Sequence, residues 1–357
     1  MKRSFLIVAV AFFIMGAVAV AEEKVLIDFQ KLDADIIPMK GEEGVMTQNR
    51  RTIMDYGAVA GASYTDEQKA LMRSSLAIAQ WEVELNSSSK NPISVAVSKV
   101  KEAEVKADAR NFAGQKLMGV RIEFPTWANN ANAKIKPAFL IPAYEPMAQV
   151  DDEGNLQKPT AEEKASGVTR FEDGYGVIHN TGIIKSIAVN TYGMNFPHGL
   201  FVLLRNQHNE VKRYFMGYLL FDGWRELIWN NPSYTSEVRS RELRLYPVYP
   251  VAFPYLAFEG FLVTRDAAHD GGPCVAYFKD VKIIYDKAVL VTARDFADED
   301  IWGIQTKRIE EKKRIEVSRF GQKQVLRWLE KEKLATEEGF TPSEGSEAAN
   351  NGGGTAE

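Results

Sequence analysis

Apolar and polar residues alternate along much of the chain, which is the pattern of strands with one buried face. The alternation is most regular in the second half, where turns rich in Asn, Asp, Gly and Pro separate the segments and no helical pattern intervenes. Short strands arranged in this way predict an antiparallel β-sandwich. The predicted strands of this half are 183–190, 199–206, 212–221, 225–229, 241–249, 258–265, 276–286 and 288–293.

The first half is less regular. Its predicted strands are 25–29, 79–85 and 119–124, with a further apolar stretch at 138–143. Thr65 and Gln68 have the spacing of a capping box and predict a short helix that continues to Leu76. Two regions have no clear strand pattern: 94–110 is interpreted as a helix or a solvated excursion, and 151–169 as a protruding polar loop or hairpin.

Aromatic residues locate the core. Nineteen of the 38 Phe, Tyr and Trp residues fall between Tyr192 and Tyr285. Aromatic and β-branched side chains pack well on a half-buried sheet face, so this region is predicted to form most of the core. The strand at 25–29 is expected to close the sandwich from far away in the sequence.

The chain changes character after residue 303. Residues 304–340 are dense in Lys, Arg and Glu with a partial apolar stripe, which predicts one charged helix or two helices broken at Phe320-Gly321. Because this helix lies outside the alternating region, we expect it to serve in assembly and the sandwich to fold without it. Residues 341–357 are rich in Ser, Glu, Asn and Gly and are predicted to be disordered.

The first 21 residues resemble a secretory leader. Lys2 and Arg3 precede an apolar run of about 16 residues that ends in Ala19-Val20-Ala21, a small-residue cleavage site. The alternative, a membrane anchor, requires about 20 apolar residues. The predicted domains are therefore a leader at 1–21, a sandwich at 22–303, the helical extension and the tail, with export to the periplasm and no membrane anchor.

Composition narrows the class of protein. The 357 residues are 45% hydrophobic and 26% charged, which is typical of a folded globular chain. The net charge of −4 comes with no clustered basic face, so a nucleic-acid partner is not expected. Cys274 is the only cysteine, so the exported fold is expected to rely on its core rather than on disulfides.

The sequence contains no recognisable catalytic or metal motif. The four histidines, at positions 179, 198, 208 and 269, have no close metal-ligand spacing, and no nucleophile elbow, Walker loop or dinucleotide fingerprint is present. We therefore predict no catalytic, cofactor-binding or metal-binding residues. Calcium bound by scattered loop oxygens stays open, because such sites leave no sequence pattern.

The most distinctive local feature is the run Phe221-Asp222-Gly223-Trp224-Arg225. Trp224 is interpreted as a core residue after a hairpin turn, and Trp229 shares that interpretation. The alternative is a sugar-stacking platform, since jelly rolls often bind sugars on aromatic faces. An exposed, coplanar Trp or Tyr pair would favour the sugar-binding alternative.

Several segments together resemble one family, the outer-layer (sheath) proteins of spirochaete periplasmic flagellar filaments, the FlaA type. The resemblance covers residues 25 to 302 and is carried by VLIDF at 25–29, GVRIEFP at 119–125, IAVN at 187–190, YLLFDGW at 218–224 and YFKDVKIIYD at 277–286. These are sheet-building patterns and contain no catalytic signature. The secretory leader agrees with the resemblance, because outer-layer proteins of this type cross the inner membrane by general secretion.

The resemblance implies a mainly β fold, an antiparallel jelly-roll sandwich of the galactose-binding-like kind with helical insertions and a charged C-terminal helix. It implies a non-enzymatic structural subunit without cofactors, which coats a core of flagellin subunits and affects filament stiffness and shape. Self-association in a helical lattice would follow, because contacts that do not close generate helical arrays. The alternative function that remains is a secreted carbohydrate-binding module on the same fold.

Overall fold

A computed structural model describes residues 21–32, 36–38, 46–48, 52–127, 130–143, 171–243, 254–266, 269–288 and 298–336. Four predicted features lie outside the described residues: the apolar run of the leader, the polar loop at 151–169, the strand at 288–293 beyond residue 288, and the C-terminal tail at 341–357.

Eight strands form a jelly roll, as the family resemblance implies. They pair antiparallel in nested order, the first with the last and so on to the central hairpin: β8 with β16, β9 with β15, β11 with β14, and β12 with β13. Two sheets result, called here the first sheet (β14-β11-β16-β8) and the second sheet (β13-β12-β15-β9). The strands are β8 (Lys116–Phe124), β9 (Asn132–Lys136), β11 (Thr181–Met194), β12 (His198–Asn206), β13 (Val211–Tyr218), β14 (Asp222–Asn230), β15 (Tyr255–Arg265) and β16 (Gly272–Lys287).

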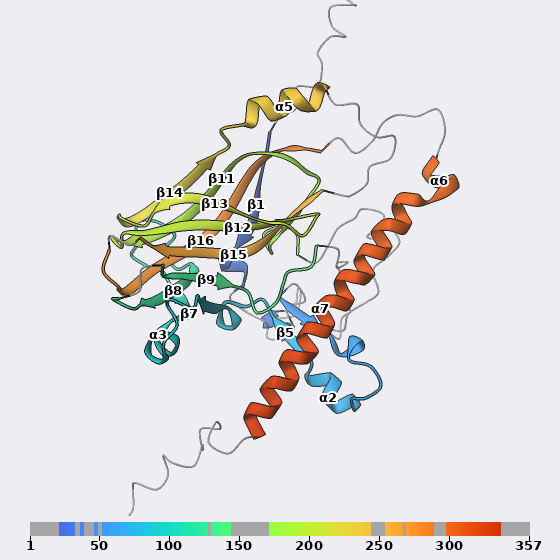
Figure 1. Cartoon of the computed structure of the whole chain (residues 1–357), viewed down its shortest axis with the longest axis horizontal. Coiled ribbons are helices and arrows are strands. Elements are labelled where there is room, and N and C mark those ends of the chain that lie inside the picture. The colour runs from blue at the N-terminus through green and yellow to red at the C-terminus, as the bar shows by residue number, and fades with distance from the viewer. Residues whose placement is uncertain are drawn as a thin grey trace, which may run out of the picture.

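Further strands widen both sheets (Figure 1). The chain enters as β1 (Glu22–Asp28), which pairs with β16 and confirms that a distant N-terminal strand closes the sandwich. β7 (Lys99–Glu104) extends the first sheet, and β6 (Glu82–Leu85) and β10 (Val177–His179) extend the second. Two small hairpins lie apart from the sheets: β2 (Ile36–Pro38) with β3 (Met46–Gln48), and β4 (Ile53–Asp55) with β5 (Arg73–Ser75).

The helices lie at the ends and sides of the sandwich (Figure 1). They are the short 3-10 helices η1 (Phe29–Leu32), η2 (Gly57–Val59) and η3 (Ile78–Gln80), and the α-helices α2 (Asp66–Leu71), α3 (Pro92–Val97), α5 (Tyr234–Leu243), α6 (Asp298–Trp302) and α7 (Ile304–Thr336). The 33-residue α7 is the longest. No helix among the described residues is long and apolar enough to cross a membrane.

The core lies between the two sheets, where the alternating strands place their apolar side chains. Phe261 of the second sheet stacks on Phe278 of the first, with ring centroids 4.3 Å apart. Phe29 and Trp81 belong to the same aromatic group, and their two rings meet edge to face with centroids 5.4 Å apart. The Trp81 indole N–H donates to the Leu76 carbonyl at 2.8 Å. The N-terminal segments therefore complete the core that the second half builds.

Four predictions about local structure were wrong. The segment predicted as a strand at 241–249 begins inside α5 at residues 241–243, and its remaining residues lie outside the described part of the chain. α5 forms because Asn231 organises its start: the Asn231 side chain accepts from Ser233 N and donates to Glu237. The short helix predicted to reach Leu76 instead ends at Leu71 in α2, and β5 follows.

The other two corrections concern the N-terminal half of the chain. The region 94–110 is neither one helix nor a free excursion: Asn91 caps α3, which ends at Val97, and β7 follows directly. Trp81 lies between η3 and β6 rather than inside a strand at 79–85.

Helix α7 is continuous through Phe320-Gly321, where a break was one of the two alternatives. The glycine is explained by close packing, because a Cβ at Gly321 would lie 2.5 Å from the Val59 side chain. Gly321 therefore allows η2 to approach the helix, and no break in the helix is needed.

Candidate assembly surfaces

No metal cluster is formed by the described residues: nowhere do three His, Cys, Asp or Glu side chains gather to hold an ion. His198 is buried, with its ring edge to face against Phe124 at 5.1 Å, and burial lowers its pKa. His179 contacts the Glu172 carboxylate and the Ala143 carbonyl. His198 begins β12 and His208 follows its other end, so the strand separates them.

Cys274 is part of the core. Its side chain is buried in β16, and burial raises the pKa of the thiol to about 12. The thiol therefore stays protonated and lacks the thiolate that a nucleophile requires.

Trp224 and Trp229 lie on opposite faces of β14. Trp229 points inward and meets Tyr214 of the second sheet at 4.8 Å, so its predicted packing role is confirmed. Trp224 is half-buried on the outer face of the first sheet, against Tyr192 at 5.5 Å and Phe112 at 4.6 Å. The assignment of Trp224 to the core was wrong. Side chains alternate between the two faces of a strand, so Trp224, five residues before the inward Trp229, points outward.

The outer face around Trp224 is an aromatic cluster closed by a loop. The rings of Phe112 and Tyr192 meet Trp224 edge to face, at 68° and 81°. Lys279 covers Phe112 at 5.1 Å and pairs with Asp280. Trp224 and Trp229 do not form the coplanar exposed pair that sugar stacking requires. The sugar-binding alternative therefore loses its main support.

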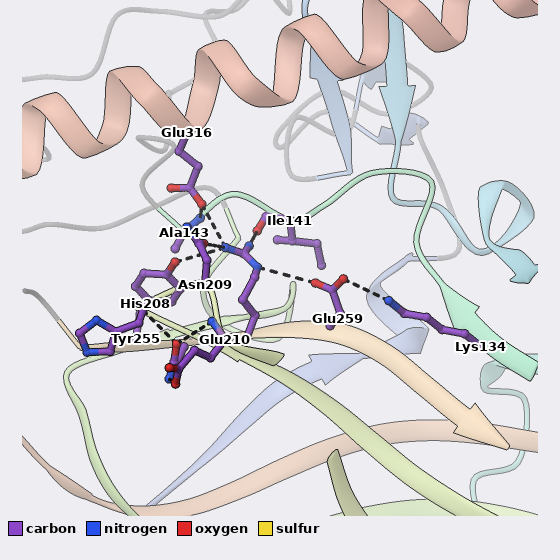
Figure 2. A network of polar contacts seen from close by, with 11 residues as sticks. Lys134, Ile141, Ala143, His208, Asn209, Glu210, Tyr255, Glu259 and Glu316 are labelled. Atoms are coloured by element: carbon purple, nitrogen blue, oxygen red, sulfur yellow. Dashed lines mark hydrogen bonds and ion pairs between the residues drawn. The ribbon is translucent and has the colours of Figure 1, made fainter. Parts of the chain in front are cut away.

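Helix α7 is attached to the sandwich through Glu316, which Figure 2 shows pointing from the helix toward Ala143 and Tyr255. Arg205 of β12 has a side chain that is only 4% exposed and donates to the Tyr255 hydroxyl at 3.2 Å and to the Ile141 carbonyl. Glu316 reaches down from α7, places a carboxylate oxygen 3.5 Å from the guanidinium and accepts from Ala143 N at 3.0 Å. A buried charge must be paired, so Glu316 ties the helix to the sandwich.

The same network extends away from the helix. Glu259 of β15 lies 3.7 Å from the Arg205 guanidinium and 3.2 Å from Lys134. Burial raises the pKa of Tyr255 to about 12, with Arg205 acting in the opposite direction. Tyr255 therefore remains a neutral hydrogen-bond acceptor for Arg205 at neutral pH.

A second contact of α7 is apolar. Phe320 is 6% exposed and packs edge to face against Phe139 at 5.4 Å and Tyr56 at 6.2 Å. Two turns further along, Trp328 meets Tyr64 at 6.0 Å. One face of α7 is thus bound to the N-terminal segments of the sandwich.

One end of the sandwich carries exposed apolar side chains. The strand register brings together the β8–β9, β11–β12, β13–β14 and β15–β16 connections, because Met194 pairs with Asp222, Gly199 with Tyr218, and His198 with Arg265. Helix α3 joins this end because it lies between Leu85 of β6 and Lys99 of β7. We call this surface the loop end, defined by its exposed side chains Ile93, Val95, Trp127, Met194, Tyr218 and Leu220.

Sequence comparison identifies the family. The model of the flagellar filament outer layer protein family FlaA matches residues 45–294. The outer layer protein of Treponema pallidum (strain Nichols) is 68% identical over 347 residues, covering 97% of this chain and 98% of that protein. The chain belongs to the family of flagellar filament outer layer proteins. The family resemblance given by the sheet-building segments is therefore confirmed.

Other members of the outer layer family are more distant. The Spirochaeta aurantia protein is 42% identical over 349 residues, covering 98% of both chains. The Borreliella burgdorferi protein is 30% identical over 230 residues, covering 64% of this chain and 61% of that protein. The chain is thus a flagellar filament protein of the spirochaete type, and its structural role is in the filament outer layer.

Solved structures with similar folds include carbohydrate-binding modules. TmCBM61 in complex with beta-1,4-galactotriose aligns with 58% of this chain and 90% of its own, at 8% identity and a TM-score of 0.26. The family 11 module of Lic26A-Cel5E from Clostridium thermocellum aligns with 60% and 91%, at 7% identity and a TM-score of 0.25. The jelly-roll assignment of this outer layer protein rests on its own strand order.

Sequence reasoning missed two of these surfaces. Arg205 lies at an outward position of a predicted strand and gives no sign that α7 covers it. The loop end is assembled from segments more than a hundred residues apart, so only the register of the sheets reveals it. The apolar residues within turns, such as Trp127 and Leu220, were the available signal.

Proposed function

We propose that the mature chain is a non-enzymatic subunit that coats a core of flagellin in the periplasmic flagellum and adds stiffness and shape to the filament. The observation that carries this proposal is the near full-length similarity to outer layer proteins. A subunit of this kind must repeat along the filament, so modest contacts are sufficient when each copy has many neighbours.

The compact jelly roll supports a mechanical role. Both sheets are held by long antiparallel ladders, and β16 alone pairs with β11, β8 and β1. A closely packed sandwich deforms little, so a layer of such subunits resists bending of the core that it covers.

Export through a cleaved leader fits the start of the fold. β1 begins at Glu22, directly after the predicted cleavage at Ala21, and Glu22 pairs with Lys287 at 2.8 Å. Cleavage at Ala21 leaves this strand whole at the new N-terminus. Mass spectrometry of the protein purified from periplasmic flagella tests this, and a mature chain that begins within β1 would contradict it.

Electron cryo-microscopy of periplasmic flagella tests the main proposal. Filaments are compared from the parent strain, a strain that lacks the gene, and that strain complemented with the gene. We expect a thinner filament without the gene and recovery on complementation. An unchanged filament in the deletion strain would overturn the proposal.

A further inference from the structure

The loop end has the composition of a protein interface. Its exposed side chains include Trp127, which is 76% exposed, and Leu220, which is 57% exposed. Exposed large apolar residues gathered from several loops mark an interaction surface rather than ordinary scatter. The interior strands of the sandwich need none of these side chains, since the core is complete without them.

Few charges lie among the loop-end segments, and the two signs are separated. Arg265 is buried and donates to the Pro125 carbonyl, so it does not face a partner. The exposed Asp222 and Asp270 and the half-buried Asp266 lie at the edges of the β13–β14 and β15–β16 connections, whereas the exposed Lys90 and Lys99 flank α3. Depletion of charge in the centre and polar groups at the rim is typical of interfaces. At the β13–β14 and β15–β16 connections the rim therefore favours a basic partner.

Helix α7 has a second apolar face with the complementary charge. Its docked face includes Phe320 and Gln324, whereas Ile315 and Leu326 are 49% and 62% exposed. Ile315 and Leu326 are eleven residues apart, which is three helical turns, so they share one side of α7, turned away from Phe320 and Gln324. Ile315 also borders the hollow that α7 forms with Arg205 and Tyr255. The helix contains ten Lys and Arg residues against five Glu, in a chain whose net charge is negative.

We propose that the loop end of one copy binds the outer face of α7 in a second copy, head to tail. This inference rests on the proposed function, because a layer requires contacts between copies. The acidic part of the rim, at Asp222 and Asp270, meets the basic helix, and Trp127 and Leu220 pack against Ile315 and Leu326. The Ile301 and Trp302 side chains of α6, also exposed, extend the helical surface.

The positions of the two surfaces make this contact an open one. In Figure 1, α3 and the strand ends of the loop end lie at the left, and α6 with the first turns of α7 lies at the right. Two different surfaces that bind each other leave one of each free after every addition, so copies continue in a row. A contact of the loop end with itself would close as a dimer and would not build a layer.

Cross-linking in intact filaments tests the contact. The full chain carries Trp127→Cys and Ile315→Cys together and is treated with a short bis-maleimide; the native Cys274 is buried and protonated and does not compete. We expect a ladder of multimers of this chain. Each single-cysteine variant alone yields monomers, and filaments that contain both single variants yield dimers but no ladder.

The same experiment separates this inference from the proposed function. A double-cysteine chain that enters filaments without giving a ladder overturns the head-to-tail contact and leaves the outer-layer role intact. Dimers from the Trp127→Cys variant alone also overturn it, because they indicate a loop end bound to itself. Absence of the wild-type chain from filaments overturns the proposed function, and the contact is then decided in solution.

Sedimentation velocity of the purified mature chain is the solution measurement. The wild type is expected to associate with rising concentration, and Trp127→Ser/Leu220→Ser or Ile315→Ser/Leu326→Ser to weaken that association at least about tenfold. A mixture of the two variants forms only dimers, since each retains one intact surface. Ile228→Ser, at a comparably exposed site on β14, is the control and leaves association unchanged. A monomeric wild type, or variants that associate as it does, overturn the proposal.

Discussion

Glu316 of α7 and Arg205 of β12 are 111 positions apart in the sequence and meet with 3.5 Å between carboxylate oxygen and guanidinium nitrogen. The contact joins the charged C-terminal helix to the jelly roll, and it neutralises a guanidinium that the fold has removed from water. The helix is therefore an integral part of the folded unit.

Glu316→Gln is expected to destabilise the protein. The amide oxygen can still accept from Ala143 N, but the negative charge beside Arg205 is lost. Glu259 continues to pair with Arg205, so the loss in unfolding free energy is about 1–3 kcal/mol, below that of a fully unpaired buried charge. Urea denaturation measures it. Glu311→Gln, on the exposed side of α7, is the matched control and changes stability by less than about 0.5 kcal/mol.

Gly321→Ala is expected to destabilise the contact between α7 and η2, although Ala favours helices. The new Cβ would lie 2.5 Å from Val59, which forces the helix and η2 apart and costs about 1–3 kcal/mol. The Val59 Cβ is itself 2.5 Å from the new Cβ, so Gly321→Ala is combined with Val59→Gly, which removes that atom. The double variant is expected to be about as stable as Val59→Gly alone. Thermal unfolding of Gly321→Ala, the double variant and Val59→Gly alone decides this. Equal stability of Gly321→Ala and wild type would contradict the packing argument.

The strand content could be predicted because alternation is a local signal. Residues 199–206 and 276–286 became parts of β12 and β16 as expected. In β16 the buried residues recur at nearly every second position, whereas β12 is buried along almost its whole length. The nested pairing of the jelly roll came from the family resemblance, because alternation does not tell which strands are neighbours. α5 was missed because its ten residues have no apolar stripe and depend on the Asn231 side chain.

The surfaces could not be predicted because they depend on long-range contacts. Arg205 stands at an outward strand position, and only the docking of Glu316 and Ile141 makes that position buried. Trp224 was assigned to the core on composition, but its face is fixed by the register of β14 with β11. Such properties belong to the arrangement of elements, and local patterns do not contain them.

Trp224→Ala is expected to cost less than Trp81→Ala. Trp224 contacts Phe112 and Tyr192 on an outer face, so its loss lowers the unfolding free energy by about 1–2 kcal/mol. Trp81 is buried against Phe29 and donates to Leu76, so its loss costs about 3–5 kcal/mol. Chemical denaturation of both variants measures the difference, and equal losses would contradict the half-buried position of Trp224.

His198 is expected to make stability depend on pH. Burial is the main cause that lowers its pKa, and His269 and Arg265 act in the same direction. A histidine with a lowered pKa stays neutral in the folded state at a pH where the same histidine in the unfolded chain takes up a proton. Its contribution to stability is therefore fully present above the unfolded-state pKa of about 6.5. That contribution is lost as the pH falls below this value. Replacing His198 by Phe removes this proton and retains a ring against Phe124. The measurement is the difference in urea-unfolding free energy between wild type and His198→Phe from about pH 7.5 to 5.5. This difference should shift steadily in favour of His198→Phe as the pH falls. A difference that stays constant with pH would refute a lowered pKa for His198.

Truncation after Trp302 is expected to leave a folded but weaker sandwich. All strands of the jelly roll end by Lys287 and pair among themselves, so the far-ultraviolet circular dichroism should keep its β signature. The loss of α7 exposes the surfaces of Tyr56 and Phe139 that Phe320 covers and removes Glu316 from Arg205. We expect the unfolding free energy to fall by about 2–5 kcal/mol, the range of one lost aromatic contact together with one broken buried pair.

The triple variant Glu316→Gln/Phe320→Ala/Trp328→Ala in the full chain is the control. It should reproduce most of the loss while retaining the helix, because the stabilisation comes from these contacts and not from helix formation itself. A truncated chain as stable as the full one would show that α7 contributes nothing to the fold, and an unfolded one would show that the jelly roll requires it.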